Sequence, residues 1–165
     1  IYVEHLNAPL EHLAFWSGFV GSVTAFSNMI TSPLLGRLSD KVGATRILLI
    51  SLAGASVMFA PQAFVGSVGE LLVWRFLLGF FIGGLLPTVN TLIRRFTPRG
   101  MESRAYGINS SAFALGNMLG PLAGGLLSGL IGIEGLFLLS SALLAATAFW
   151  FYLSTAKARP SKAER

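Results

Sequence analysis

The chain contains little charge and no cysteine. Of its 165 residues, 12% are Asp, Glu, Lys or Arg, whereas 53% are hydrophobic, and the mean hydropathy is +0.70. The lack of cysteine excludes a disulfide framework and any thiolate metal site. An ordinary soluble domain is about 25% charged, so this composition indicates a protein that lies in the bilayer.

Groups that carry out catalysis are also scarce. The two histidines, His5 and His12, both lie near the start of the chain. The sequence contains no nucleophile with a neighbouring base and no metal-ligand cluster, and the Gly-rich segment GGLLP at residues 83–87 lacks the lysine of a nucleotide-binding loop. We therefore expect no enzyme activity, no cofactor and no metal.

The chain is rich instead in long stretches without charge. A helix that crosses the hydrocarbon core needs about 20 predominantly apolar residues. Five segments reach or approach that length, at about residues 13–36, 47–69, 74–93, 104–131 and 135–156. The fold class predicted is all-α: a polytopic integral membrane bundle, with one partial transmembrane domain over residues 1–165 and a tail at 157–165.

Basic residues alternate with acidic residues from one connector to the next. All but one of the 12 Lys and Arg residues lie in the first connector, the third connector and the tail: Arg37, Lys41, Arg46, Arg94, Arg95, Arg99, Arg104, Lys157, Arg159, Lys162 and Arg165. Lys and Arg near helix ends stay cytoplasmic, so we expect a multi-pass protein of the cell (inner) membrane with a cytoplasmic carboxy terminus. The net charge of +5 thus reflects topology, and no nucleic acid partner is expected.

Asparagine indicates which segments face something other than lipid. A side-chain amide in hydrocarbon is costly unless it meets a partner or water. Asn28 lies in the first segment, Asn90 in the third, and Asn109 and Asn117 in the fourth, whereas the second and fifth segments contain none. We expect the first, third and fourth segments to line an interior. The alternative is that these amides only join helices to one another.

Glycine and proline predict close packing and bending in the fourth segment. In GNMLGPLAGG, residues 116–125, Gly116, Gly120 and Gly124 recur every four residues and form a face that another backbone can approach. Pro121 is expected to bend this helix. Close packing without motion is the alternative.

The third segment also contains glycines and a proline, in RFLLGFFIGGLLP. Gly79, Gly83 and Pro87 soften its axis, and Arg75 stands at its outer end. An arginine in this place either reaches the membrane interface or faces a cavity, and both roles stay open.

Three motifs occur in a characteristic order and spacing. GRLSDKVGATR, residues 36–46, has Gly36, Asp40, Lys41 and Gly43 at the fixed places of a loop signature between the second and third helices of a six-helix half. RFLLG, residues 75–79, is similar to an Arg-bearing signature of the fourth helix, and GNMLGPLAGG to a Gly-Pro signature of the fifth. The ordered set resembles the major facilitator superfamily, in particular its bacterial drug:proton antiporter branch.

The resemblance implies that the five segments are helices two to six of one six-helix half. Ala44 and Thr45 stand where the amino-terminal copy usually has basic residues, which favours the carboxy-terminal half, helices eight to twelve of twelve. The chain starts at Ile1 without a visible signal peptide, and we interpret it as a fragment that lacks the amino-terminal half and the first helix of this half. In this family the eighth, tenth and eleventh helices line the cavity, and they correspond to the three segments that contain asparagine.

The function implied by the resemblance is secondary transport by alternating access, with efflux of drugs or other small molecules and the proton as coupling ion. Asp40 would act as an inner-side latch against a helix of the other half, and Arg37 and Lys41 would orient it or bind lipid headgroups. A solvated loop is the alternative for the two basic residues. No Asp, Glu, His or Lys lies inside the five segments, so we expect the proton site in the absent part. A sugar or organic anion carrier of the same superfamily and a non-transporting scaffold or channel subunit are the alternative functions.

Overall fold

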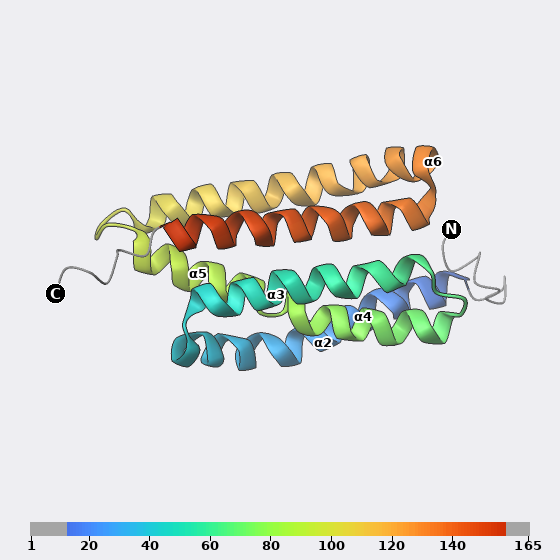
Figure 1. Ribbon diagram of the computed structural model, residues 1–165, viewed down its shortest axis with the longest axis horizontal. Helices are drawn as coiled ribbons and strands as arrows, with labels where there is room; N and C mark the ends of the chain where they lie inside the picture. Colours follow the sequence, from blue (N-terminus) through green and yellow to red (C-terminus); the bar gives the residue numbers. More distant parts are fainter. Residues whose placement is uncertain (1–12, 158–165) are drawn as a thin grey trace.

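The chain folds into a bundle of helices that lie side by side along one axis (Figure 1). The structure is a computed structural model that describes residues 13–157, and over this range the chain forms helices and short connectors without any strand. The chain passes from one end of the bundle to the other and back, as the alternation of apolar segments and polar connectors predicts. The predicted all-α fold is confirmed.

The first two helices form a hairpin around a single glycine. Helix α2 spans Leu13–Val42 and helix α3 spans Ala44–Phe59. Gly43 separates them with a φ of +104°, a conformation that favours glycine over residues with a side chain. The helix continues through Gly36, past the end of the predicted segment 13–36, and ends before Gly43. Most of the predicted connector is therefore helical.

The turn between α3 and the next helix is fixed by a proline and a capping serine. A 3₁₀ turn, η2, covers Ala60–Ala63 and has Pro61 in its first turn. The side chain of Ser67 accepts a hydrogen bond from the N–H of Glu70 at 3.3 Å, and the Glu70 carboxylate accepts one from the N–H of Gly66 at 3.2 Å. This reciprocal cap defines where the following helix begins.

The third predicted segment, 74–93, is built from two helices instead of one. Helix α4 spans Val68–Ile82 and helix α5 spans Leu85–Phe96. Gly83 and Gly84 form a turn between them. Two adjacent glycines weaken a helix at this point, so the crossing segment is interrupted near its middle.

Helix α6, Glu102–Lys157, consists of two helical arms. Gly132 interrupts it with φ 73° and ψ 172°, a backbone conformation that glycine adopts and residues with a side chain rarely do. Figure 1 shows the arms running antiparallel beside each other. We call residues 102–131 the first arm and residues 133–157 the second arm. They contain the fourth and fifth predicted segments.

The arrangement of the elements places α3 at the centre. Helix α2 packs against α4, and α3 contacts α2, α4, α5 and the second arm of α6, whereas the first arm lies at the edge of the bundle (Figure 1). Leu48 and Leu52 of α3 pack on Ala148 of the second arm, and Val20 of α2 packs on Leu71 of α4. The apolar core is thus divided between two helix contacts.

The bundle buries many small hydroxyl side chains and exposes many large apolar ones, unlike a soluble protein. Small hydroxyl side chains are buried where helices meet: Ser27, Thr31, Ser39, Ser51, Ser56 and Thr88. Large apolar side chains lie outside, and Leu130 and Trp150 are 81% and 76% exposed. In lipid no hydrophobic force drives helices together, so small residues pack at interfaces and large apolar ones face the acyl chains.

Length and composition support the same environment. Among the described residues, three helical stretches are long and apolar enough to cross a membrane: Ala44–Ala63, Val68–Phe96 and Glu102–Ala156. The last one contains both arms of α6. Helix α2 is 30 residues long, but Ser, Thr and Asn recur along it, and it is not one of the three. The predicted polytopic membrane bundle is confirmed.

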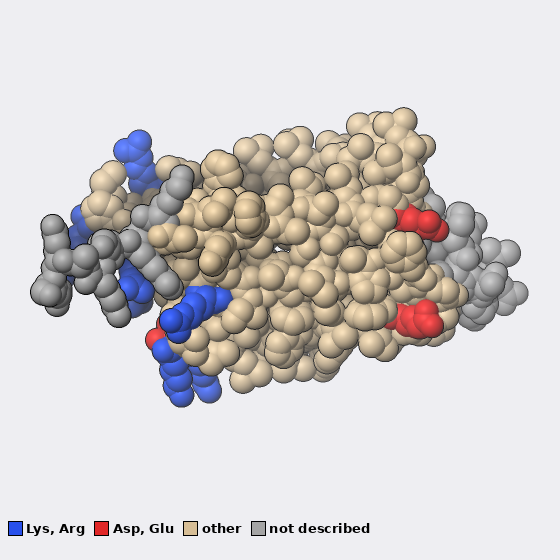
Figure 2. Space-filling view, in the orientation of Figure 1, with Lys and Arg blue, Asp and Glu red and all other residues tan. Residues whose placement is uncertain are grey.

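Charged side chains gather at the two ends of the bundle. Figure 2 shows Lys and Arg at one end, acidic side chains at the other, and an uncharged surface between them. The basic end comprises the end of α2, the start of α3, the end of α5 and both ends of α6, and the acidic end contains Glu70 and Glu134. The basic end carries Arg37, Lys41, Arg46, Arg94, Arg95, Arg99 and Arg104, together with Asp40 and Glu102. An uncharged band between two charged rims fits the hydrocarbon layer.

Candidate functional site

Helix α2 crosses α4 at two glycines of the predicted Gly-rich segment. A Cβ on Gly79 would clash with the backbone oxygen of Thr24 and lie 2.9 Å from the Cβ of Ser27. A Cβ on Gly83 would lie 3.2 Å from the backbone oxygen of Asn28. Gly79 therefore permits a backbone approach that a residue with a Cβ does not allow, whereas a Cβ on Gly83 would first meet the hydroxyl of Thr31. Asn28 is half-buried beside this crossing.

The start of α5 is supported by hydroxyl groups. Thr88 Oγ1 donates to the carbonyl oxygen of Gly84, and Thr91 Oγ1 donates to that of Pro87 at 2.9 Å. The Gly84 carbonyl also accepts from the backbone N–H of Thr88, so the Thr88 hydroxyl is a second donor to it. Gly36 lies within α2, where an added Cβ would be 3.5 Å from the Cβ of Pro87. The structure thus places Gly36 at a helix contact, whereas the sequence places it where the first segment meets the loop signature.

The four asparagines lie on three different passes of the chain. The Tyr106 hydroxyl donates to the backbone oxygen of Asn90 at 3.2 Å, one turn before Asn109 on the first arm. Asn117 is exposed further along the same arm. Within residues 13–157 no hydrogen bond joins the side chains of any two of these asparagines. Their role in lining a cavity stays a prediction.

The first arm has no neighbour on its glycine face. Nothing lies within 4 Å of a Cβ added to Gly116 or Gly120, and one on Gly124 would be 3.8 Å from Leu136. Every residue from 110 to 123 is exposed. The backbone stays helical at Pro121, because the residue of α6 with non-helical backbone angles is Gly132. Packing or bending at this face stays a prediction.

Arg75 contacts the second arm near the acidic end. Its guanidinium carbon Cζ lies 5.6 Å from the centroid of the Phe137 ring, within the range of a cation–π interaction. The ring of Phe59 lies 6.3 Å from the same ring, between centroids. These contacts join α4 to α3 and α6 through one aromatic side chain.

Asp40 lies at the basic end in the last turn of α2. Its side chain is exposed, as are those of Arg37 and Lys41. In the part of the chain that the structure describes, the Asp40 carboxylate has no ion-pair partner. It is therefore accessible to a group that lies outside this bundle.

A reciprocal serine pair joins α3 to the second arm, and the sequence did not predict it. Ser56 Oγ donates to the carbonyl oxygen of Ser141 at 2.8 Å, and Ser141 Oγ donates to that of Ser56 at 2.7 Å. The two serines are 85 residues apart in sequence, so no local pattern indicates the contact.

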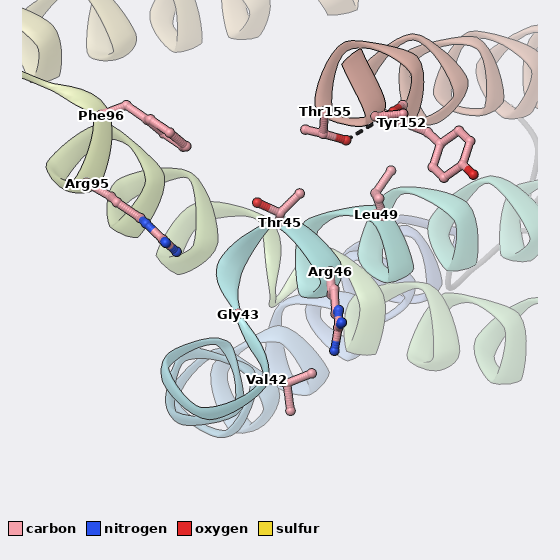
Figure 3. Close-up of a pocket in the computed structure, with 10 residues that line it drawn as sticks. Val42, Gly43, Thr45, Arg46, Leu49, Arg95, Phe96, Tyr152 and Thr155 are labelled. Atoms are coloured by element: carbon pink, nitrogen blue, oxygen red, sulfur yellow. Dashed lines mark hydrogen bonds between the residues drawn. The ribbon is translucent and has the colours of Figure 1, made fainter. Parts of the chain in front are cut away.

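A pocket of about 770 Å³ opens at the basic end. In Figure 3, Arg95 and Phe96 approach from α5, Tyr152 and Thr155 from the second arm, and Thr45 lies between them on α3. Sequence reasoning missed this pocket because its walls come from four elements, α2, α3, α5 and α6. The lining residues are Val42, Gly43, Thr45, Arg46, Leu49, Arg95, Phe96, Tyr152, Thr155 and Ala156.

Metal chemistry has no visible basis in this bundle. Residues 13–157 include no group of three or more His, Cys, Asp or Glu side chains that could hold a metal ion. What the geometry offers is packing glycines, interrupted helices and polar groups at the edges of an apolar bundle.

Comparison with known proteins identifies close sequence relatives. The multidrug resistance protein MdtG of Dickeya zeae is 36% identical over 154 residues, which are 93% of this chain and 38% of that protein. The uncharacterized MFS-type transporter YuxJ of Bacillus subtilis is 39% identical over 153 residues, 93% of this chain and 39% of that protein. A homolog of the multi-drug resistance efflux pump PmrA in Lactococcus lactis is 34% identical over 157 residues, 95% of this chain and 39% of that protein.

The family follows from a match over nearly the whole chain. The chain spans about two fifths of the length of the curated relatives it matches. The family model of the Major Facilitator Superfamily matches residues 3–165. This range contains all three ordered motifs and the complete helical bundle, so the predicted family is confirmed: the chain belongs to the major facilitator superfamily.

Proposed function

We propose that this chain is part of a secondary transporter that exports drugs or other small molecules. The observation that carries the proposal is the family match, together with relatives named for multidrug resistance that align with more than nine tenths of the chain. These relatives also support the predicted drug:proton antiporter-like branch. A protein that spans a bilayer needs apolar side chains on its surface and charged side chains at both ends, and this bundle has both features.

The chain would form helices eight to twelve of twelve. Five of twelve helices agree with the two fifths of the relatives' length that the chain covers. The missing partners are then the amino-terminal half and the first helix of this half. The exposed stretch 110–123, with open space at Gly116 and Gly120, offers an apolar face for such partners.

The basic end would face the cytoplasm, with the carboxy terminus on the same side of the inner membrane. Arg and Lys gather at this end, and the positive-inside rule gives that end a cytoplasmic location. In this orientation the acidic end, with Glu70 and Glu134, faces outward.

Alternating access requires contacts that form in one state and break in the other. Asp40 suits this role because it is exposed at the proposed cytoplasmic end and has no ion-pair partner among residues 13–157. It would hold a group of the other half while the cavity is open outward. The Gly83–Gly84 turn between α4 and α5 would supply the bending that the motion needs.

Proton coupling would depend on residues outside this chain. A proton-driven carrier needs a titratable group within the membrane. The predicted spans contain no Asp, Glu, His or Lys, so the proton site is assigned to the other half. Proton coupling itself is inferred from the family.

Dye efflux from bacteria that express the whole transporter tests this function. We expect extrusion of a lipophilic cationic dye that stops when a protonophore collapses the proton gradient. The variant Asp40→Asn should lower the efflux rate at least about tenfold at an unchanged membrane level, since the loss of one latch interaction of about 1.4 kcal/mol changes an equilibrium tenfold.

The matched control is Glu134→Gln, which removes one exposed carboxylate at the opposite end of the bundle. It should transport like the parent protein. Full transport by a well-expressed Asp40→Asn variant would refute the latch, and failure of the parent protein to move any dye would refute drug export.

A further inference from the structure

The pocket at the basic end is not part of the proposed transport route. It lies between the start of α3, the end of α5 and the end of the second arm, and none of the four asparagines lines it (Figure 3). Its volume of about 770 Å³ is within the range of small-ligand sites, about 300–1,000 Å³.

The pocket is positively charged without compensation. Arg46 and Arg95 line it, and none of the ten lining residues is acidic. Both arginines are exposed and have no ion-pair partner in the described bundle. Asp40 and Glu102 are the acidic residues described at this end, and neither of them lines the pocket. An anionic ligand would neutralise this charge.

The polar groups around the two arginines suit a phosphate. A guanidinium can bind phosphate oxygens through two parallel hydrogen bonds. Thr45 lies in the first turn of α3, a 16-residue helix without a side-chain cap, and the amides of Arg46 and Ile47 donate to the carbonyl oxygen of Gly43. The partial positive charge of this helix end adds to the charge of the two arginines. Tyr152 also lines the pocket, and Figure 3 shows its hydroxyl directed away from Arg95.

The remaining walls are apolar and lead into the uncharged band. Val42, Leu49 and Phe96 line the pocket. Beyond it, exposed apolar side chains continue along the two helices, with Ile50 on α3 at 56% exposed and Phe149 on the second arm at 63%. A ligand with a phosphate at the rim and hydrocarbon below it matches this sequence of surfaces.

The tail of the chain is a poor occupant on grounds of charge. After Lys157 the sequence contains Arg159, Lys162 and Arg165 and a single acidic residue, Glu164. A basic segment would be repelled by Arg46 and Arg95, whereas a membrane supplies anionic headgroups at the same level as the helix ends.

We propose that this pocket binds the phosphate headgroup of an anionic phospholipid, with Arg46 and Arg95 contacting the phosphate and the acyl chains lying along α3 and the second arm. Because its walls come from four elements, the bound lipid holds the ends of α2, α3, α5 and α6 together. The site depends on the geometry of the bundle and is independent of which molecule is transported.

Lipid binding to the whole, delipidated protein in detergent tests the proposal. Phosphatidylglycerol is titrated, and the retained lipid is counted by native mass spectrometry. The double variant Arg46→Gln/Arg95→Gln should bind about tenfold more weakly or worse, since each basic residue near a lipid surface contributes substantially to its attraction. The control Arg99→Gln/Arg104→Gln removes the same charge from the same end, outside the pocket, and should change affinity less than about threefold.

A second readout keeps the test valid if the double variant is unstable. The single variant Arg95→Gln alters an exposed side chain near the end of α5, and it should lose most of the rise in melting temperature that phosphatidylglycerol gives the parent protein. An equal loss of lipid affinity in both double variants would overturn the proposal, because it would mean that the lipid is attracted to the charged surface without a specific site. Unchanged lipid affinity in both double variants would overturn the proposal too.

Two further titrations identify the source of the phosphate. Zwitterionic phosphatidylcholine should bind at least about tenfold more weakly than phosphatidylglycerol, and inorganic phosphate should neither bind at millimolar concentration nor displace the lipid. Displacement by inorganic phosphate would overturn the assignment to lipid and point to a soluble anion. Equal binding of phosphatidylcholine would overturn the role of the two arginines.

Discussion

At the scale of single residues, glycines that look alike in sequence lie in very different surroundings. Gly79 touches α2 so closely that a Cβ would meet the Thr24 backbone oxygen and the Ser27 side chain, whereas Gly116 and Gly120 face open space. All three occur in small-residue patterns. Only the position of a neighbouring helix distinguishes a contact glycine from an open one.

We expect Gly79→Ala to destabilise the whole transporter by about 1–3 kcal/mol, as overpacking of a filled helix contact does. The obstructing atom belongs to the backbone of Thr24 and cannot rotate away. The melting temperature of the purified protein measures the effect.

The control is Gly69→Ala in the first turn of the same helix, where nothing lies within 4 Å of the added Cβ. This variant should match or slightly exceed the stability of the parent protein, because alanine favours helix. If both variants melt at the same temperature as the parent, α2 and α4 do not pack as described.

At the scale of elements, the serine pair joins the second and fifth apolar segments. From the sequence alone, these two segments are distinguished only by their lack of asparagine. Ser56 and Ser141 exchange hydrogen bonds between side chain and backbone, and both are at least half-buried between α3 and the second arm. Hydrogen bonds between helices in a membrane contribute modestly, since the separated helices find other partners.

Ser56→Ala and Ser141→Ala should each lower the free energy of unfolding by about 0.5–1.5 kcal/mol, because each removes one hydroxyl that donates to a backbone carbonyl of the other helix. The measurement is unfolding of the purified protein in detergent. Ser128→Ala serves as control, because its hydroxyl bonds to Gly125 within one arm and joins no two helices. Losses at Ser56 and Ser141 no larger than the loss at Ser128 would contradict the pair.

Element positions were readable from hydropathy, whereas their ends and interruptions were not. Apolar length predicts each pass of the chain, because burial in lipid depends on composition along the segment. The continuation of α2 to Val42 and the break at Gly83 depend on local backbone geometry and on contacts with α4 and α5. The pocket at the basic end depends on the ends of four helices, and no spacing in one sequence records their distance.

At the scale of the whole molecule, the separation of charge into two rims is the feature that sequence and structure share most directly. Lys and Arg alternate along the chain with apolar segments, and the helical hairpins gather them at one end (Figure 2). This follows from connectivity alone, because consecutive antiparallel helices return every second connector to the same side. Orientation in the membrane is then set by charge and not by tertiary contacts.

Cysteine labelling of the whole transporter tests this orientation, and the absence of cysteine from this chain makes single replacements clean. Gly66→Cys at the acidic end should react with a membrane-impermeant maleimide added to intact cells, because Gly66 is exposed and has no atom within 4 Å of an added Cβ. Arg99→Cys in the exposed connector at the basic end should react only after the cells are made permeable. Any cysteine elsewhere in the protein is first replaced. Labelling of Arg99→Cys in intact cells, with Gly66→Cys protected, would mean that the basic end faces outward, and it would contradict both the proposed cytoplasmic latch and a lipid site in the inner leaflet.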